Sequence, residues 1–338
     1  MALRADHAHL ARPSQPTDGR RPDARPRFLT AYADWLARKR DAEEAAGGKP
    51  HAHDTRLRHS DAGKCARAIA LDLAGVPREP MDAAGLHVVE LGQMIHELVQ
   101  ERLADEYGDD VECEVRCQID GLDASGHVDA VITQHRDVSE VPYQDLAMDT
   151  GSNTEERRIA YELKSVGGYG YKSAVGAAGP AEGPRYTAVR QGALNALAID
   201  ADELVIGMVA TEAISQPQAR RAGGLDEVAR WAAEFTYSRE EWEPIARSEQ
   251  ARLQRILDLY DDGLLAPRAI PDPQIPHGAL IADPTTGAWQ HTDEHGQVLD
   301  VGQAWQCGYC PHQATCAGLG AGYEPVSRVQ AGEAGDAA

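Results

Sequence analysis

Apolar residues recur along the chain with two spacings, and each spacing predicts one kind of element. Three- and four-residue spacing is typical of helices, whereas alternation is typical of strands. Helical spacing predicts helices from Phe28 to the Gly47-Gly48 break, from a Ser60 cap to Leu73, and over 84–106, 185–198 and 225–260. Alternation predicts strands over 111–119, 126–133, 159–166 and 203–211. This order predicts an α/β fold, with a small mixed sheet flanked by helices and a helical region before it.

Polar stretches interrupt this pattern. Residues 1–27 hold six arginines and almost no apolar pattern, which predicts a disordered, mildly basic leader. Residues 135–157 are rich in Asp and Glu, and 267–305 are rich in proline, glycine and polar residues, so we expect two exposed insertions. Residues 325–338 are expected to form a disordered tail. One folded domain over 28–317 follows.

Charge limits the partners of this chain. Lys and Arg total 33 against 54 Asp and Glu, giving a formal charge of −21, so any contact with nucleic acid must be local. A protein with this net charge can still bind an anionic substrate, because divalent cations held by carboxylates would offset the negative charge of a substrate phosphate. No apolar run approaches the roughly 18 residues that cross a bilayer, and the N-terminus lacks the apolar segment of a signal peptide. We therefore expect a cytoplasmic protein with no membrane partner.

Candidate chemistry begins in Tyr161-Glu162-Leu163-Lys164. Strand geometry puts Glu162 and Lys164 on one face, and Asp129 joins them if its strand pairs with theirs. Two carboxylates supply oxygen ligands for Mg²⁺ or Mn²⁺, and an ammonium group can orient the attacking water. Charge alternation on a solvated strand face also produces Glu-x-Lys, so the pair alone is weak evidence.

Two further polar residues lie near this pair in the predicted order of elements. His96 is on the predicted 84–106 helix beside Ile95, where a histidine is usually a hydrogen-bonded boundary residue. Gln191 is on the helix after the Lys164 strand, and by itself would be a surface residue. Their meaning depends on the combined pattern.

Four motifs follow one another along the chain: a helix with Gly-x3-His, a strand with Gly-His-x-Asp, a strand with Glu-x-Lys and a helix with Gln. This order resembles the RecB-like branch of the PD-(D/E)XK nucleases, over about residues 60–212 and 305–317. The resemblance implies a restriction-endonuclease-like sheet and metal-dependent hydrolysis of DNA, as an exonuclease acting at a free or single-stranded end in recombination, repair or phage DNA metabolism. It implies these roles: His96, Asp129, Glu162 and the Leu163 carbonyl as metal ligands, Lys164 as the water-orienting residue, and Gln191 as a site or DNA contact.

This chain departs from the family at two points. The family often has tyrosine four residues after the glutamine, and here that residue is Asn195. The spacing from Asp129 to Glu162 is also long, which we attribute to the acidic insertion. A rival function is a catalytically inactive iron–sulfur or zinc subunit that binds DNA within a larger complex.

The cysteines predict a second site. Cys307, Cys310 and Cys316 share a short segment whose spacing rarely occurs without a metal. Cys65 precedes the nuclease pattern, and this arrangement resembles the iron–sulfur nucleases of the AddB and CRISPR-associated RecB-like kinds, which implies a [4Fe–4S] cluster joining both ends of the domain. A structural Zn²⁺ on the same four cysteines, or on three and His312, fits the spacing equally well.

The remaining cysteines and a glycine-rich segment complete the candidates. Cys113 and Cys117 lie on one predicted strand face and are expected to be small core side chains. Tyr169, Tyr171 and Lys172 follow the Glu-x-Lys strand, where stacking on bases and a phosphate contact would suit a single-stranded end, although a flexible turn explains them as well. Two arginines, Arg185 and Arg190, are candidates for added positive charge.

Overall fold

The computed structural model describes residues 29–45, 55–137, 154–271, 279–282, 288–292, 298–303, 307, 309–320 and 322–330. Contacts divide the chain into two compact units, residues 1–49 and 50–338. Helix α1 (Leu29–Ala45) lies in the first unit, and all other elements lie in the second. Within the described ranges, no helix is long and apolar enough to cross a membrane. The predicted leader, 1–27, lies outside the described residues.

The second unit contains both α-helices and β-strands. Its helices are α2 (Ala66–Leu73), α3 (Ala83–Tyr107), α4 (Gly168–Ala174), α5 (Tyr186–Ala198), α6 (Gln216–Arg221), α7 (Arg239–Asp261), α8 (Gln313–Ala317) and α9 (Ser327–Gln330), with 3₁₀ turns η1 (His59–Asp61), η2 (Gly108–Asp110) and η4 (Val228–Arg230). Its strands are β1 (Leu57–Arg58), β2 (Val111–Gln118), β3 (Ala124–Asp137), β4 (Thr154–Val166), β5 (Glu203–Ala210), β6 (Ala232–Ser238), β7 (Leu264–Leu265), β8 (Ala269–Pro271), β9 (Ala279–Ala282), β10 (Ala288–Thr292), β11 (Val298–Gln303) and β12 (Glu324–Pro325).

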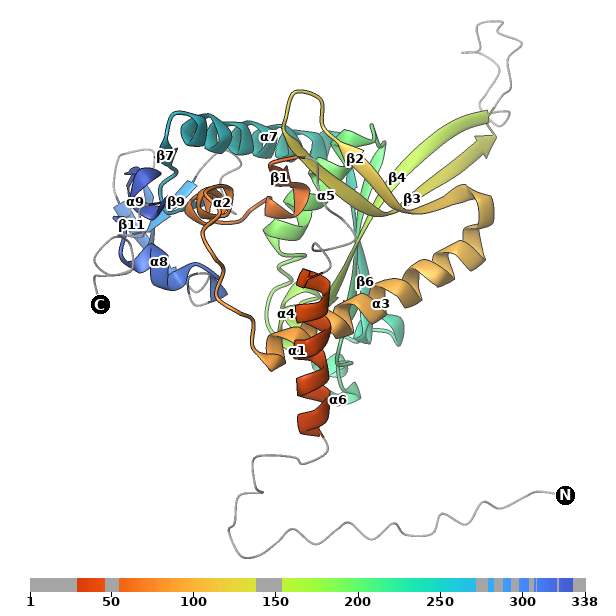
Figure 1. Cartoon of the computed structure of the whole chain (residues 1–338). Coiled ribbons are helices and arrows are strands. Elements are labelled where there is room, and N and C mark those ends of the chain that lie inside the picture. The colour runs from red at the N-terminus through yellow and green to blue at the C-terminus, as the bar shows by residue number, and fades with distance from the viewer. Residues whose placement is uncertain are drawn as a thin grey trace, which may run out of the picture. The chain divides into compact units, whose positions relative to one another are not determined.

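A mixed six-stranded sheet forms the centre of this unit, as the sequence predicted (Figure 1). The strand order is β1-β3-β4-β5-β6, with β2 also paired to β3. β4 and β5 are parallel and are joined through α4 and α5, because parallel neighbours need a crossover connection. β3 with β4 and β5 with β6 are antiparallel.

Strand β3 changes partner along one edge. It pairs with β4 from Asp137 to Ala130, and with β1 only at Ala124 and Ser125. β2 overlaps both of these stretches, since it pairs with residues 125 to 132, so β4 and β1 must share the opposite edge of β3. Residues 126–129 therefore lie in a fork, where β3 and β4 no longer pair. Hydrogen-bonding groups in this fork must find other partners.

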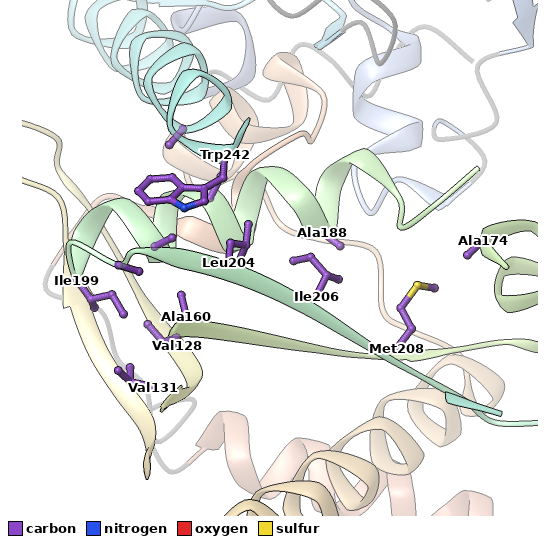
Figure 2. Close-up of a cluster of buried hydrophobic side chains, with 14 of the residues drawn as sticks. Val128, Val131, Ala160, Ala174, Ala188, Ile199, Leu204, Ile206, Met208 and Trp242 are labelled. Carbon is purple, nitrogen blue, oxygen red and sulfur yellow. The ribbon is translucent and has the colours of Figure 1, made fainter. Parts of the chain in front are cut away.

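Apolar side chains fill both faces of the sheet. Successive residues of β4 alternate, with Ala160 in the cluster beneath α5 and α7 and Tyr161 in the cluster on the opposite face. Figure 2 shows Leu204 and Ile206 on the sheet below Ala188 of α5, with Trp242 coming from α7. Residues of α3 pack against the second cluster, so α3 and α5 cover opposite faces.

Two sequence predictions about elements were wrong. The predicted 225–260 helix is instead strand β6 followed by α7, because Phe235 and Tyr237 alternate with polar residues and pack on the core as the partner strand of β5. The predicted exposed insertion 267–305 contains a four-stranded antiparallel sheet, β11-β10-β9-β8. Its Ile270 and Leu280 are buried against Cys65, so short apolar runs among the polar residues are part of a packed layer.

Three boundaries also differ. β3 and β4 extend into the predicted insertion 135–157 and pair as far as Asp137 with Thr154, which leaves 138–153 outside the described residues. The predicted tail begins in β12 and α9, and Val326 is buried, so ordered structure continues to Gln330. Ser60 does not cap a helix, since α2 begins after Cys65. Val88 and Leu98 of α3 are exposed, because only one side of that helix meets the sheet.

Candidate active site

The fork between β3 and β4 holds Asp129. Asp129 Oδ2 accepts a hydrogen bond of 2.6 Å from the Leu163 N–H, which strand pairing does not use there. On the other side, the β2 ladder pairs Cys113 with Ala130 but does not pair Glu114 with Asp129, and Glu114 has a φ of 53°. This local break in the ladder directs the Asp129 carboxylate towards β4.

Helix α3 braces the break. Gln100 Nε2 donates to the Asp129 carbonyl at 3.0 Å and to Glu114 Oε1 at 2.6 Å. The same helix brings His96 Nδ1 to 3.4 Å from Asp129 Oδ1. A Cβ at Gly92 would lie 3.0 Å from Ser165 Oγ, so glycine one turn before His96 allows the helix to approach β4.

Strand β4 supplies the second carboxylate and the ammonium group. Glu162 is buried, with 1% of its surface exposed, and its Oε1 accepts from Lys164 Nζ. Lys164 Nζ also donates to Gln191 Oε1 at 3.2 Å. The two residues share the face that α5 covers, as strand alternation predicted.

All five predicted side chains of the first site therefore meet at one place. They come from four different elements: His96 from α3, Asp129 from β3, Glu162 and Lys164 from β4, and Gln191 from α5. Their roles remain predictions.

The two carboxylates influence each other. Burial raises the pKa of Glu162, the nearby Asp129 raises it further, and Lys164 opposes the change. Burial lowers the pKa of Lys164, but Glu162 and Asp129 outweigh burial, so the net direction is upward. Burial also lowers the pKa of His96, and again Asp129 turns the net shift upward. A bound cation would relieve the repulsion between the carboxylates, so this donor set fits a divalent metal.

A buried polar network that sequence reasoning missed supports Glu162 from behind. Asn195 Nδ2 donates to Glu162 Oε2 at 2.8 Å, and His59 Nδ1 lies 2.7 Å from Asn195 Oδ1. The only sequence signal was the replacement of the family tyrosine by Asn195. His59 carried no signal, since nothing local marks it as buried.

The cysteines predicted to form the second site lie in one region of the fold, near enough for their thiols to influence one another's charge. The thiol of Cys65 interacts electrostatically with Cys316, and the thiols of Cys307 and Cys310 interact with both. Burial raises the pKa of Cys65, Cys307 and Cys310, and the neighbouring thiols raise it further. Cys113 packs, half-buried, on the cluster under α3, and Cys117 is buried in the cluster under α5, so both are core side chains as predicted. The prediction that they share one strand face was wrong, because the break in the ladder at Glu114 shifts the alternation of β2.

Backbone and arginine groups surround these thiols. Cys65 is the cap residue of α2, and the backbone N–H groups of Ala68, Arg67 and Ala269 near its sulfur oppose the rise in its pKa. Arg67 is buried and donates to the carbonyls of Ala266 and Gly320, at 2.5 and 3.1 Å, which ties α2 to the C-terminal segment. Because the net pKa shift of Cys65, Cys307 and Cys310 is upward, these thiols are neutral as they stand, and a bound metal or cluster would be needed to hold them as thiolates.

His312 contributes a further polar group beside the cysteines. Its Nε2 lies 2.9 Å from Asp72 Oδ1, and its buried Nδ1 has no hydrogen-bond partner among the residues that the structure describes. Histidines that bind a metal commonly do so through one ring nitrogen and donate a hydrogen bond from the other nitrogen to a carboxylate. The donor set therefore fits a [4Fe–4S] cluster on four cysteines and equally a zinc ion that includes His312.

Several predicted substrate contacts are placed elsewhere. Tyr171 is fully buried in α4 and donates to the Ala229 carbonyl at 2.9 Å, so it cannot stack on a base. Arg190 is buried against Glu249 at 3.0 Å and is not a surface charge. These predictions were wrong because a glycine-rich segment became a helix and because α5 is buried under α7. Tyr169 is 80% exposed, Arg185 is exposed and Lys172 is half-buried.

Comparisons with known proteins add little to this picture. No family model and no curated protein matches the chain. A solved structure titled "Crystal structure of SSO0001" aligns with 13% identity over 68% of this chain and 86% of that chain, at a TM-score of 0.37. Such a likeness carries no argument about function.

Within the described part of the chain, no three His, Cys, Asp or Glu side chains are arranged tightly enough to hold a metal ion as they stand.

Proposed function

We propose that this protein is a divalent-metal-dependent DNA nuclease with a restriction-endonuclease-like sheet, of the RecB-like PD-(D/E)XK kind, acting as an exonuclease. The observation that carries the proposal is the meeting of Asp129, Glu162 and Lys164 in the fork between β3 and β4. Two carboxylates beside an ammonium group form a hydrolytic site for a phosphodiester. The acidic surface charge restricts DNA contact to this neighbourhood.

Each residue has a distinct part in this proposal. Asp129 and Glu162 would hold Mg²⁺ or Mn²⁺ with His96 and the Leu163 carbonyl. When bound, the ion supplies charge stabilisation at the phosphate and a more acidic water. Lys164 would orient that water, and Gln191 holds the Lys164 ammonium group at 3.2 Å. Tyr169 remains the exposed aromatic that could stack on a single-stranded end.

The direct test is incubation of anaerobically purified protein with end-labelled single- and double-stranded DNA and Mg²⁺ or Mn²⁺. We expect metal-dependent release of short products from the ends. Binding of DNA without cleavage under every metal condition would favour the inactive DNA-binding subunit instead.

We also propose that Cys65, Cys307, Cys310 and Cys316 hold a [4Fe–4S] cluster. The electrostatic influence of the thiols on one another and the backbone N–H groups around the Cys65 sulfur support it. Tight binding of one zinc and no iron would assign the site to Zn²⁺, with His312 as a candidate ligand.

Lys164→Ala should lose turnover while metal binding stays near the wild-type level. The ammonium group would orient or deprotonate the attacking water and would not bind the metal, so we expect a loss of about 10²- to 10⁴-fold in kcat. Single-turnover cleavage and Mn²⁺ titration measure the two effects separately. Lys39→Ala in α1 is the matched control and should retain full activity. Equal activity of Lys164→Ala and wild-type protein would contradict the assignment.

Gln191→Ala should cost less than the loss of a metal ligand. Its amide contacts Lys164 but neither carboxylate, and the family tyrosine beyond it is replaced by Asn195, so we expect roughly tenfold weaker DNA binding as the main effect. DNA affinity and kcat are measured in parallel. Lost turnover as large as that of a Glu162 variant, with unchanged DNA binding, would move Gln191 into the catalytic group.

A further inference from the structure

The side-chain amide of Asn195, behind Glu162, is buried and uses all of its hydrogen-bonding groups. Asn195 has 1% of its surface exposed, and so has His59. Asn195 Nδ2 donates to Glu162 Oε2 at 2.8 Å and to the His127 carbonyl at 3.0 Å. Asn195 Oδ1 accepts from the Cys117 thiol at 3.6 Å and lies 2.7 Å from His59 Nδ1. Both donors and both lone pairs of the amide are therefore in use.

These contacts determine which way the amide faces. In the reversed orientation, its oxygen would face the Glu162 carboxylate and the His127 carbonyl, which are both acceptors. Only the orientation with Nδ2 towards Glu162 makes hydrogen bonds on both sides. Because Oδ1 can only accept, His59 Nδ1 must carry the proton in this pair.

The fold leaves space for this pair at one place on β3. A Cβ at Gly126 would lie 2.6 Å from His59 Nδ1 and 2.8 Å from Asn195 Oδ1. Glycine in the fork is therefore needed for His59 and Asn195 to meet. The His127 carbonyl, which the fork also leaves without β4, is the second anchor of the amide.

We propose that Asn195, held by His59, is the positioning residue that aims the Glu162 carboxylate at its metal, in place of the tyrosine usual in the family. The inference rests on the proposed function and goes further, since it assigns a role to two residues that touch neither metal nor DNA. Lys164 contacts the other oxygen of Glu162, but as a cation it competes with a metal for the carboxylate, so its loss should not weaken metal binding; the neutral amide of Asn195 orients the carboxylate without competing. Partners of this kind commonly tune metal affinity as strongly as 10- to 100-fold.

Mn²⁺ binding, measured by titration calorimetry on the full-length protein, tests the inference without relying on activity. Asn195→Ala should weaken Mn²⁺ binding by about 10- to 100-fold and raise the Mn²⁺ concentration needed for half-maximal cleavage. Saturating Mn²⁺ should restore most of kcat, because no group that touches substrate is lost. Tyr171→Phe is the matched control: it removes a part-buried hydrogen bond of a buried side chain in the apolar cluster beneath α5, and Mn²⁺ affinity should not change.

A His59 pair keeps the test valid if Asn195→Ala does not fold. His59→Leu removes the donor to Asn195 and should weaken Mn²⁺ binding, whereas His59→Asn keeps a donor at the Nδ1 position and should restore it. Wild-type Mn²⁺ affinity in Asn195→Ala or His59→Leu, even with a lowered melting temperature, would overturn the positioning role while leaving the nuclease intact. Wild-type protein that binds no Mn²⁺ would overturn the proposed function and the inference together.

Discussion

Glu162→Gln should abolish metal-dependent cleavage of DNA. The amide keeps the shape of the carboxylate but loses its charge, so the site loses a ligand while the surrounding packing stays in place. We expect kcat/KM to fall on the order of a thousandfold or more, which corresponds to about 4 kcal/mol of transition-state stabilisation. Asp129→Asn should show a similar loss, because Asp129 holds the other half of the carboxylate pair.

The measurement is a time course with end-labelled DNA and Mn²⁺, together with Mn²⁺ titration of each variant. Glu203→Gln is a matched control, since Glu203 is a mostly buried acid on the neighbouring strand that pairs with Arg157 far along the sheet from Lys164. It should cleave like the wild type. His96→Ala should also lose most activity, as the third side-chain ligand. Full activity in Glu162→Gln would remove Glu162 from the active site.

Cys65→Ala should release the metal of the cysteine site and destabilise the whole second unit. Cys65 lies more than two hundred residues before Cys307, and a shared cluster closes that loop in the unfolded chain. By analogy with cross-links of long loops, the loss is roughly 5 kcal/mol of unfolding free energy. Arg67 and the packing of Leu319 on α2 would remain, so the C-terminal segment would loosen without losing every contact.

Anaerobic protein should be brown, with broad visible absorbance and about four irons per chain. Replacing Cys307, Cys310 or Cys316 should have the same effect on iron content and on the melting temperature as replacing Cys65. Cys113→Ala is the control, because Cys113 lies under α3 and takes no part in the site. Unchanged metal content in Cys65→Ala would contradict the cross-link, whereas colourless protein with one zinc would contradict only the identity of the metal.

Local patterns predicted the framework of the site well. Alternation placed β2, β4 and β5 within a few residues, and helical spacing placed α3 and α5. Strand geometry alone put Glu162 beside Lys164, since residues two apart in a strand share a face. The predictions of His96, Asp129 and Gln191 depended on the order of motifs, and the fold brings all three to the same fork.

The same local patterns failed where burial depends on distant partners. Strand β6 was predicted as part of a helix, because the alternation of Phe235 and Tyr237 with polar residues covers only a short stretch. These residues form a strand because they pair with β5. Arg190 was predicted at the surface, yet Glu249 on α7 makes it a buried ion pair. Polar composition likewise concealed the sheet over β8–β11, whose few apolar residues pack on Cys65.

The amino-acid sequence by itself determined the order of elements and the side chains that carry the proposed chemistry, because those depend on spacings of two to four residues. Only the tertiary structure decided that β3 and β4 part at Ala130 and leave a fork, and that His59 and Asn195 meet behind Glu162. His59 and Asn195 are far apart along the chain. Such contacts form only when several elements pack at once, so no local pattern encodes them.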